Sequence, residues 1–142
     1  MSSDQNKTLT RRFYDEVFNK KNFGVIDELC APGFVDHNPA PGQGSGLQGL
    51  KSWMQQFLQA FPDMKVTVHE MIAEGDVVVT RLTCQGTHKG TFMGAAPTGR
   101  SVRFSALDMV RIKNGQATEV WHEGNDALVM MELGAHMPAA AK

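Results

Sequence analysis

Apolar residues recur at helical spacing in three stretches of the first half of the chain, residues 4–18, 23–29 and 47–61. This spacing predicts three amphipathic helices, and Pro62 ends the third. Between the second and third helices, residues 34–37 form a brief extended piece that leads into a loop rich in proline and glycine. The third helix is the clearest, with the apolar residues Leu47, Leu50, Trp53, Met54, Phe57, Leu58 and Phe61.

Beyond Pro62 the apolar period changes from helical to two. The turn Lys113-Asn114-Gly115 indicates a hairpin, because Asn-Gly is a strong signal for a tight turn between strands. A short helix over residues 126–133 closes the pattern. Alternation predicts strands in four stretches, residues 64–72, 76–88, 101–112 and 116–121.

The order of these elements is three helices, then a meander of antiparallel strands, then one helical turn. Helices segregated to one side of a curved sheet make an α+β architecture of two layers. A strongly bent sheet capped by helices encloses an internal apolar pocket, where a small molecule could bind. We expect one domain over residues 1–134, followed by a loose tail over residues 135–142.

Composition and charge narrow the possible functions. The chain has 14 Lys and Arg against 15 Asp and Glu, a net charge of −1. These charges are scattered, so we expect no nucleic-acid partner and no binding to an anionic membrane. No apolar run resembles a signal peptide or a membrane span, which favours a soluble, cytoplasmic protein. The two cysteines, Cys30 and Cys84, lack metal-type spacing and are expected to be buried thiols.

The histidines do not indicate a metal site. No two of them have the spacing of metal ligands, and neither a nucleophile elbow nor a glycine-rich phosphate loop occurs. We therefore expect no metal and no cofactor. In the strand pattern His69 lies on the same face as Met71 and on the opposite face from Val68 and Ile72. This favours an exposed position for His69. His37 stands where the helices meet the sheet and is a candidate for lining the pocket. The neighbouring Asp36 is expected to stabilise a local turn or cap rather than to take part in catalysis.

Asp108 is unusual because it shares a strand face with apolar residues such as Phe104 and Val110. A carboxylate on an apolar face has to be paired, hydrogen-bonded or neutralised. The favoured interpretation is an ion pair with an arginine on a neighbouring strand, Arg81 being one candidate. The alternative is a carboxylate that faces the pocket with a raised pKa.

A polar cluster follows the last strand: His122, Glu123, Gly124, Asn125 and Asp126. Alternation places His122 and Asp126 on one side of the strand and Asn125 on the other. A glycine late in a strand often marks a bulge, so Gly124 leaves open whether Asn125 or Asp126 points inward. The other of these two residues would cap the helix that follows.

Several motifs resemble the SnoaL-like polyketide cyclases, also called ester cyclases, within the NTF2-like superfamily. The resemblance runs from about residue 7 to residue 134 and is carried by FVDHNP, GLQGLKSWMQQFLQAFPDM, GDVVVTRLTCQGTHKGTFMGAAPTGRSV and RIKNGQATEVWHEGNDALVMMELG. It implies a cone-shaped α+β barrel with helices over the sheet, a deep apolar pocket, and dimers or tetramers. It also implies intramolecular aldol ring closure of a small apolar or polyketide-like substrate without a cofactor, in which an aspartate near the end of the last strand removes a proton alpha to a carbonyl.

Carried onto this chain, the resemblance places Asn125 in the usual position of that aspartate, with Asp126 next to it. We therefore expect Asp126 to be the base and His122 to assist it, and His88 to be structural. The residues expected to contact substrate are Asn125, His37, Asp108, Trp53 and Phe57. Two alternatives remain open: a non-catalytic protein that binds a small molecule, and another carboxylate-dependent reaction such as epoxide hydrolysis or keto–enol isomerisation.

Overall fold

The computed structural model describes residues 2–134, apart from the side chains of residues 126–128. The tail predicted for residues 135–142 lies outside the described residues. Within the described part of the chain, no helix is long and apolar enough to cross a membrane. The elements are α1 (Ser3–Phe13), η1 (Tyr14–Asn19), η2 (Phe23–Val25), α2 (Ile26–Leu29), β1 (Cys30–Asp36), α3 (Gly46–Ala60), β2 (Lys65–Glu74), β3 (Val77–Thr87), β4 (Ser101–Lys113), β5 (Gln116–Gly124) and α4 (Asp126–Glu132).

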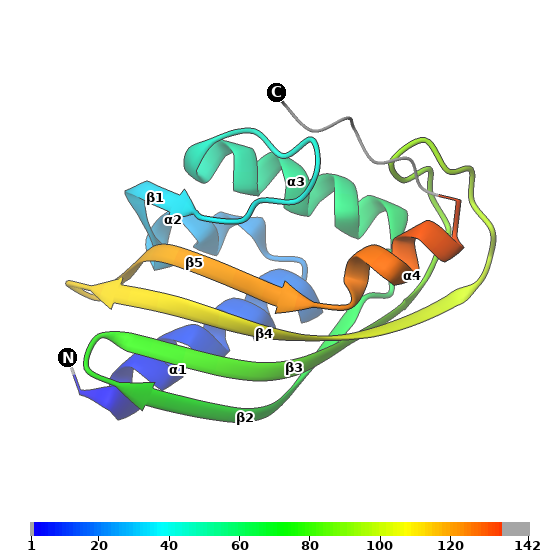
Figure 1. Ribbon diagram of the computed structural model, residues 1–142. Helices are drawn as coiled ribbons and strands as arrows, with labels where there is room; N and C mark the ends of the chain where they lie inside the picture. Colours follow the sequence, from blue (N-terminus) through cyan, green and yellow to red (C-terminus); the bar gives the residue numbers. More distant parts are fainter. Residues whose placement is uncertain (1, 135–142) are drawn as a thin grey trace.

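The strands form one mixed sheet in the order β1-β5-β4-β3-β2 (Figure 1). Strands β2 to β5 pair antiparallel, as the alternation predicted. The extended piece expected at residues 34–37 is longer than predicted: it is strand β1, which adds to the sheet edge parallel to β5. The end of β1 therefore lies beside the middle of β5, although the two are far apart in sequence.

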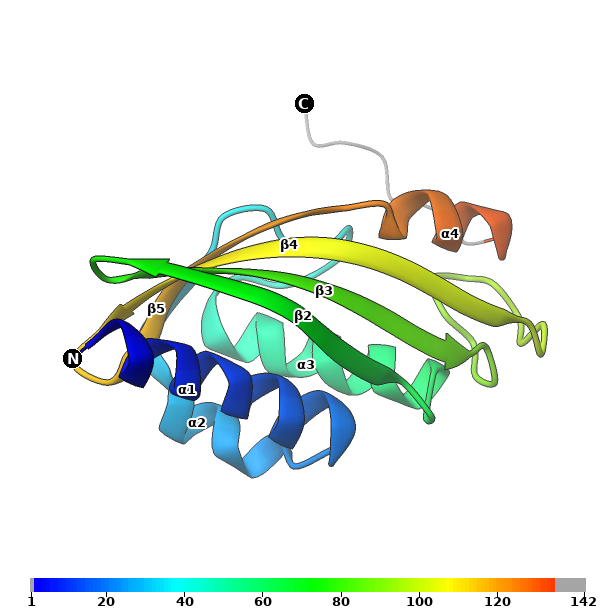
Figure 2. The ribbon, with the colours of Figure 1, turned by 90° about the horizontal axis from the view of Figure 1, so that it is seen from below.

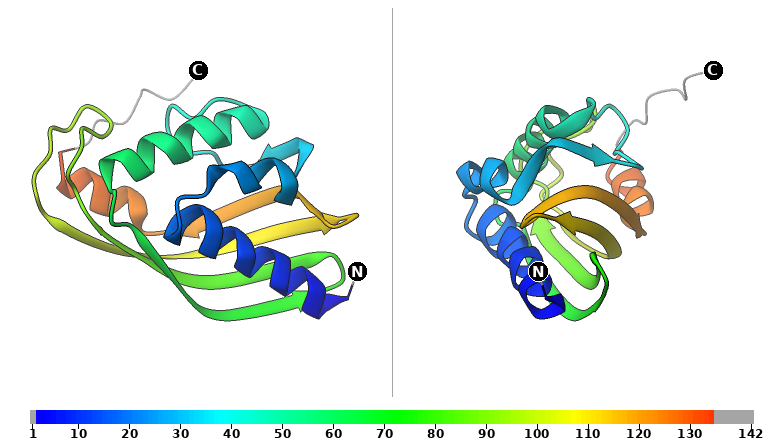
Figure 3. Two further views of the ribbon diagram at one scale, coloured as in Figure 1. Left: turned by 180° about the vertical axis from the view of Figure 1, so that it is seen from behind. Right: turned by 90° about the vertical axis from the view of Figure 1, so that its left-hand side faces the viewer.

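The helices α1, α2 and α3 cover one face of the curved sheet (Figures 2 and 3). The first predicted helix, residues 4–18, consists of two parts, because its last turn, η1, is a π-helix that begins at Tyr14. Aromatic rings fill the core at one end, where the ring of Phe57 lies 5.2 Å from that of Phe61 and 5.9 Å from that of Phe92. Both cysteine side chains are buried, as predicted.

Strand β2 departs from simple alternation. Its register to β3 shifts between Val68 and Glu70, so His69 sits in a bulge. The bulge reverses the faces of the residues that follow. Met71 packs against the core, and Ile72 is 63% exposed. The prediction that Ile72 faces inward and Met71 outward was wrong for this reason.

The β4–β5 hairpin has the expected turn, with Asn114 and Gly115 at φ 53° and 77°, the two positive values of a type I′ turn. The bulge that Gly124 left open does not occur, since Gly124 pairs in regular register with Ala106. A Cβ at Gly124 would lie 2.6 Å from the Ser105 carbonyl oxygen. Glycine is needed here because the backbones of β4 and β5 approach closely.

Candidate active site

A small apolar pocket lies between the helices and the sheet, with a volume of about 80 Å³. The helical segments contribute Leu9, Phe13 and Phe18 to it, and the sheet contributes Val110 and Val120. Three side chains that can exchange protons also line it: Tyr14, Asp108 and His122. A few polar groups converging in an apolar pocket are typical of a site for a small molecule.

His122 lies between two carboxylates. Its Nδ1 is 2.9 Å from Asp108 Oδ1, and its Nε2 is 3.2 Å from Asp36 Oδ2. Asp108 and His122 are paired across β4 and β5, so both side chains project from the same face of the sheet. Asp36 joins them because it ends β1, which runs beside β5.

Tyr14 completes the cluster from the helical layer. Its hydroxyl donates a hydrogen bond of 2.7 Å to Asp108 Oδ2, across 94 residues of sequence. Burial, and then the charge of Asp108, hold the pKa of Tyr14 well above its usual value, so the hydroxyl keeps its proton. Tyr14 is also the first residue of η1, and π-helical turns occur frequently at functional sites.

Residues of the β1–α3 connection form hydrogen bonds with Asp36 and with the backbone of His122. Asp36 accepts hydrogen bonds from the Gln43 side chain at 3.0 Å and from the Asn38 backbone at 3.2 Å. Asn38 also holds the backbone of His122: its Oδ1 accepts the His122 N–H at 2.7 Å, and its Nδ2 donates to the His122 carbonyl. These contacts fix the ring of His122 relative to both carboxylates.

The electrostatics make His122 a cation. Burial alone would lower its pKa, but the hydrogen bonds and charges of Asp108 and Asp36 outweigh burial and raise the pKa to about 10. For Asp36, burial raises the pKa, whereas hydrogen bonding to His122 and its charge, together with Gln43, bring it below the usual value. At neutral pH His122 therefore donates from both ring nitrogens, one to each carboxylate.

The prediction that Arg81 pairs with Asp108 was wrong. Arg81 lies 3.7 Å from Glu70 instead, and the charge of Asp108 is met by His122 and Tyr14. The side chain of Asp108 is 14% exposed and lines the pocket, which is where the alternative interpretation placed it.

The other predicted site residues lie apart from this pocket or cannot be placed in it. The ring of His37 stacks on Trp121 at 4.3 Å, and its Nε2 lies 3.2 Å from Glu119. Asn125 is exposed, and its Oδ1 accepts the backbone N–H of Ser105 at 2.9 Å. It stands at the N-cap position of α4 without a capping hydrogen bond from its side chain.

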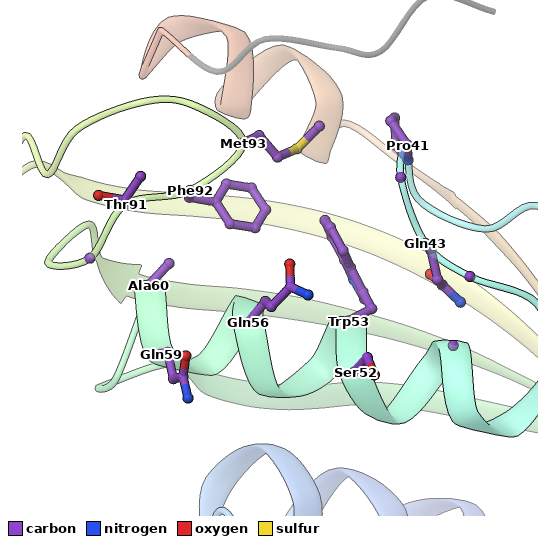
Figure 4. Close-up of a pocket in the computed structure, with 14 residues that line it drawn as sticks. Pro41, Gln43, Ser52, Trp53, Gln56, Gln59, Ala60, Thr91, Phe92 and Met93 are labelled. Carbon is purple, nitrogen blue, oxygen red and sulfur yellow. The ribbon is translucent and has the colours of Figure 1, made fainter.

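Asp126 is the first residue of α4, and its side chain lies outside the described residues. Trp53 lines a separate cleft between α3 and the loops over residues 41–44 and 90–93 (Figure 4). Phe57 is 7% exposed and belongs to the aromatic core. The role as base predicted for Asp126 and the contacts with substrate predicted for Trp53 and Phe57 remain predictions.

Three contributors to the cluster were not singled out from the sequence: Tyr14, Asn38 and Gln43. Asp36 was expected only to stabilise a turn, and it does accept the Asn38 N–H. Tyr14 is the single tyrosine of the chain and stands within an apolar helical stripe. A buried hydroxyl needs a hydrogen-bond partner. The place of Tyr14 in an apolar stripe was therefore the one sequence signal that its hydroxyl contacts a polar group in the interior.

His88 is fully buried and holds the loop before β4. Its Nδ1 lies 3.0 Å from the Thr98 hydroxyl, and its ring stacks on Phe61 at 5.4 Å. These contacts agree with the structural role expected for it. Across the residues that the structure describes, no group of three His, Cys, Asp or Glu side chains is placed to hold a metal ion.

Comparisons with known proteins agree with this architecture. The sequence profile of the SnoaL-like polyketide cyclases matches residues 8–133. The structure of IdmH from Streptomyces antibioticus, a proposed polyketide cyclase, is similar at 32% identity and a TM-score of 0.76, covering 92% of this chain and 99% of IdmH. AclR from Streptomyces galilaeus, a proposed hydroxylase, matches at 28% identity and a TM-score of 0.81, covering 94% of this chain and 98% of AclR.

A proposed SnoaL-like polyketide cyclase from Jannaschia Sp. CCS1 is 26% identical with a TM-score of 0.81, and the match covers 94% of each chain. No curated protein matches the chain. The α+β fold predicted from the sequence is confirmed by these structures.

Proposed function

Because the chain belongs to the SnoaL-like polyketide cyclase family, we propose that it closes a ring in a small apolar carbonyl compound without a cofactor. The reaction begins with removal of a proton alpha to a carbonyl and continues as an intramolecular aldol addition. One observation carries this proposal: a carboxylate, a protonated imidazole and a tyrosine hydroxyl converge in an apolar pocket.

Asp108 is the proposed base, and Tyr14 controls its availability. In the free protein the Tyr14 hydroxyl occupies Asp108 Oδ2. A substrate carbonyl that accepts the Tyr14 hydrogen bond instead would leave that oxygen open to take the alpha proton. The electron pair of the C–H bond then moves onto the carbonyl oxygen, and Tyr14 and the charge of His122 stabilise the resulting enolate.

Ring closure follows within the same molecule. The enolate carbon attacks a second carbonyl carbon, a C–C bond forms, and the electron pair of that C=O bond moves to its oxygen. This alkoxide takes back the proton held by Asp108, which gives a β-hydroxy ketone and restores the carboxylate. His122 remains protonated throughout, because Asp36 lies on its other side and maintains its charge.

The volume of the pocket favours a second candidate. About 80 Å³ is well below the roughly 300–1,000 Å³ of typical small-molecule sites. A folded polyketide chain would therefore require α1 and α3 to move apart. Keto–enol isomerisation of a small ketone uses the same base and the same oxyanion donors, and it needs less space.

Both candidates share their first step, so exchange of alpha hydrogens tests them together. We expect the protein to accelerate exchange of the alpha hydrogens of cyclohexanone in D₂O, followed by NMR. Asp108→Asn should reduce the accelerated rate about 100-fold or more, because it removes the base. Tyr14→Phe should reduce it about 100-fold, because it removes an oxyanion donor.

Asp126→Asn is the matched control, since it changes a carboxylate to an amide at the position predicted from the sequence. Loss of exchange in Asp126→Asn with retention in Asp108→Asn would assign the base to Asp126. A wild-type rate equal to that of buffer would contradict enzymatic enolisation. A Tyr14→Phe variant with an unchanged rate would contradict the proposed role of the hydroxyl.

A further inference from the structure

A second cavity, which we call the outer cleft, lies between α3 and the two loops over residues 41–44 and 90–93 (Figure 4). Its volume is about 490 Å³. The walls come from the loop over residues 41–44, from α3 and from the loop over residues 90–93. None of its lining residues lines the pocket of Asp108 and His122. The outer cleft is therefore a second cavity, connected to the cluster of His122 through Gln43, and it is large enough for a small molecule.

The described lining of the outer cleft contains no charged side chain. Along α3, Ser52, Gln56 and Gln59 recur at intervals of four and three residues and so form one stripe. Lys51 is the single charged residue of α3, and it pairs with Asp27 outside the cleft. Exposed helix faces usually carry charged residues. This face offers neutral amides and hydroxyls instead.

The amides of the stripe are available to a ligand. Within the described part of the chain, the side chains of Gln56 and Gln59 make no hydrogen bond. Gln43 is engaged, because its Nε2 donates to Asp36 and its Oε1 accepts the Ala40 N–H. Gln43 therefore forms a fixed wall, whereas Gln56 and Gln59 each offer two donors and one acceptor.

Aromatic and sulfur-containing side chains stand beside these amides. The ring centroids of Trp53 and Phe92 are 5.4 Å apart. Figure 4 shows Trp53 and Gln56 rising from α3 toward the loop that carries Phe92 and Met93. Apolar side chains and a row of neutral hydrogen-bonding groups thus meet within one cleft.

We propose that the outer cleft binds a neutral polyhydroxylated ring, such as a sugar. An ionic ligand would lose hydration without finding an opposite charge in the described lining. A hydrocarbon would leave the amides without partners. A sugar ring has an apolar C–H face that fits Trp53 and hydroxyls at its edge that can pair with Gln56 and Gln59.

The two tryptophans allow a direct test. Trp53 lines the outer cleft, whereas Trp121 stacks on His37 away from it. The indole N–H signals of the full chain would be followed by NMR during titration with the methyl glycosides of glucose, galactose, mannose and rhamnose. We expect at least one to shift the Trp53 signal with a Kd of about 1 mM or lower, and to leave Trp121 unchanged.

Two variants of neighbouring glutamines sharpen the test. Gln56→Ala should weaken binding about fivefold or more, because it removes hydrogen-bonding groups from the cleft. Gln55→Ala is the matched control, since Gln55 is exposed on α3 but does not line the cleft, and binding should not change.

Three results would overturn the proposal: no glycoside shifts the Trp53 signal, Gln55→Ala weakens binding as much as Gln56→Ala, or cyclohexanol binds as tightly as the glycosides. Tighter binding of glucuronate than of methyl glucoside would show a preference for charge and would also overturn it. None of these results bears on exchange of alpha hydrogens in the other pocket.

Discussion

The charge of His122 should make the stability of the fold depend on pH. Its pKa of about 10 in the folded protein lies above the ordinary value of 6.5. A histidine whose pKa is raised by folding contributes stability that is fully present below about pH 6.5. This contribution falls as the pH rises and is lost above the folded pKa, near pH 10.

The size of the effect follows from the pKa difference and the exposure of the ring. A change from 6.5 to about 10 corresponds to about 5 kcal/mol when solvent is fully excluded. Because 39% of the His122 side chain is exposed, water screens both carboxylates from it. We therefore expect about 1–2 kcal/mol of stability to be lost between pH 6.5 and pH 10.

The assay is urea unfolding of the wild type and of His122→Gln at several pH values in this window. Other titrating groups, such as Lys21 and Cys30, are common to both proteins and cancel in the difference. The stability advantage of the wild type should shrink by about 1–2 kcal/mol as the pH rises. His69→Gln, at an exposed histidine, should show no such trend. A constant difference, or an NMR titration of His122 near pH 6.5, would refute the reasoning.

Two substitutions test the packing that surrounds the site. Gly124→Ala should destabilise the protein by about 1–3 kcal/mol in urea unfolding, because the new Cβ would lie 2.6 Å from the Ser105 oxygen. Gly33→Ala, whose Cβ meets nothing within 4 Å, should cost clearly less, and equal costs would contradict the close approach. Phe57→Ala should cost about 3–5 kcal/mol as a core truncation. A change in ligand binding without this loss of stability would instead favour the substrate contact predicted from the sequence.

The layers of the fold could be predicted because they depend on local patterns. Helical and two-residue periods identified the helices and the four strands β2 to β5, and Asn114-Gly115 identified the hairpin turn. Errors arose where one residue changed the register. The bulge at His69 reversed the faces of Met71 and Ile72, and alternation alone contains no signal for such a bulge.

The candidate site was only partly predictable, because it is assembled by long-range contacts. His122 and Asp108 were selected individually. His122 belongs to a polar cluster, and Asp108 is a carboxylate on an apolar strand face. Their pairing needed the β4–β5 register, and the addition of Asp36 needed the parallel strand β1. Tyr14 lies 94 residues from Asp108, a separation across which no sequence period extends.

The placement of the base depends on the backbone of Gly124. A bulge there would have been needed to turn Asn125 to the face of His122, but the regular register continues through Glu123 and Gly124. The side chain of Asn125 then pairs with the backbone of Ser105, beyond the last paired residue of β5. Regular pairing therefore keeps His122 opposite Asp108 and gives the pocket a carboxylate from β4. If Asp108 is the base, proton abstraction does not require an aspartate at position 125, where the resemblance predicted one. The exchange rates of Asp108→Asn and Asp126→Asn distinguish Asp108 from Asp126 as the base.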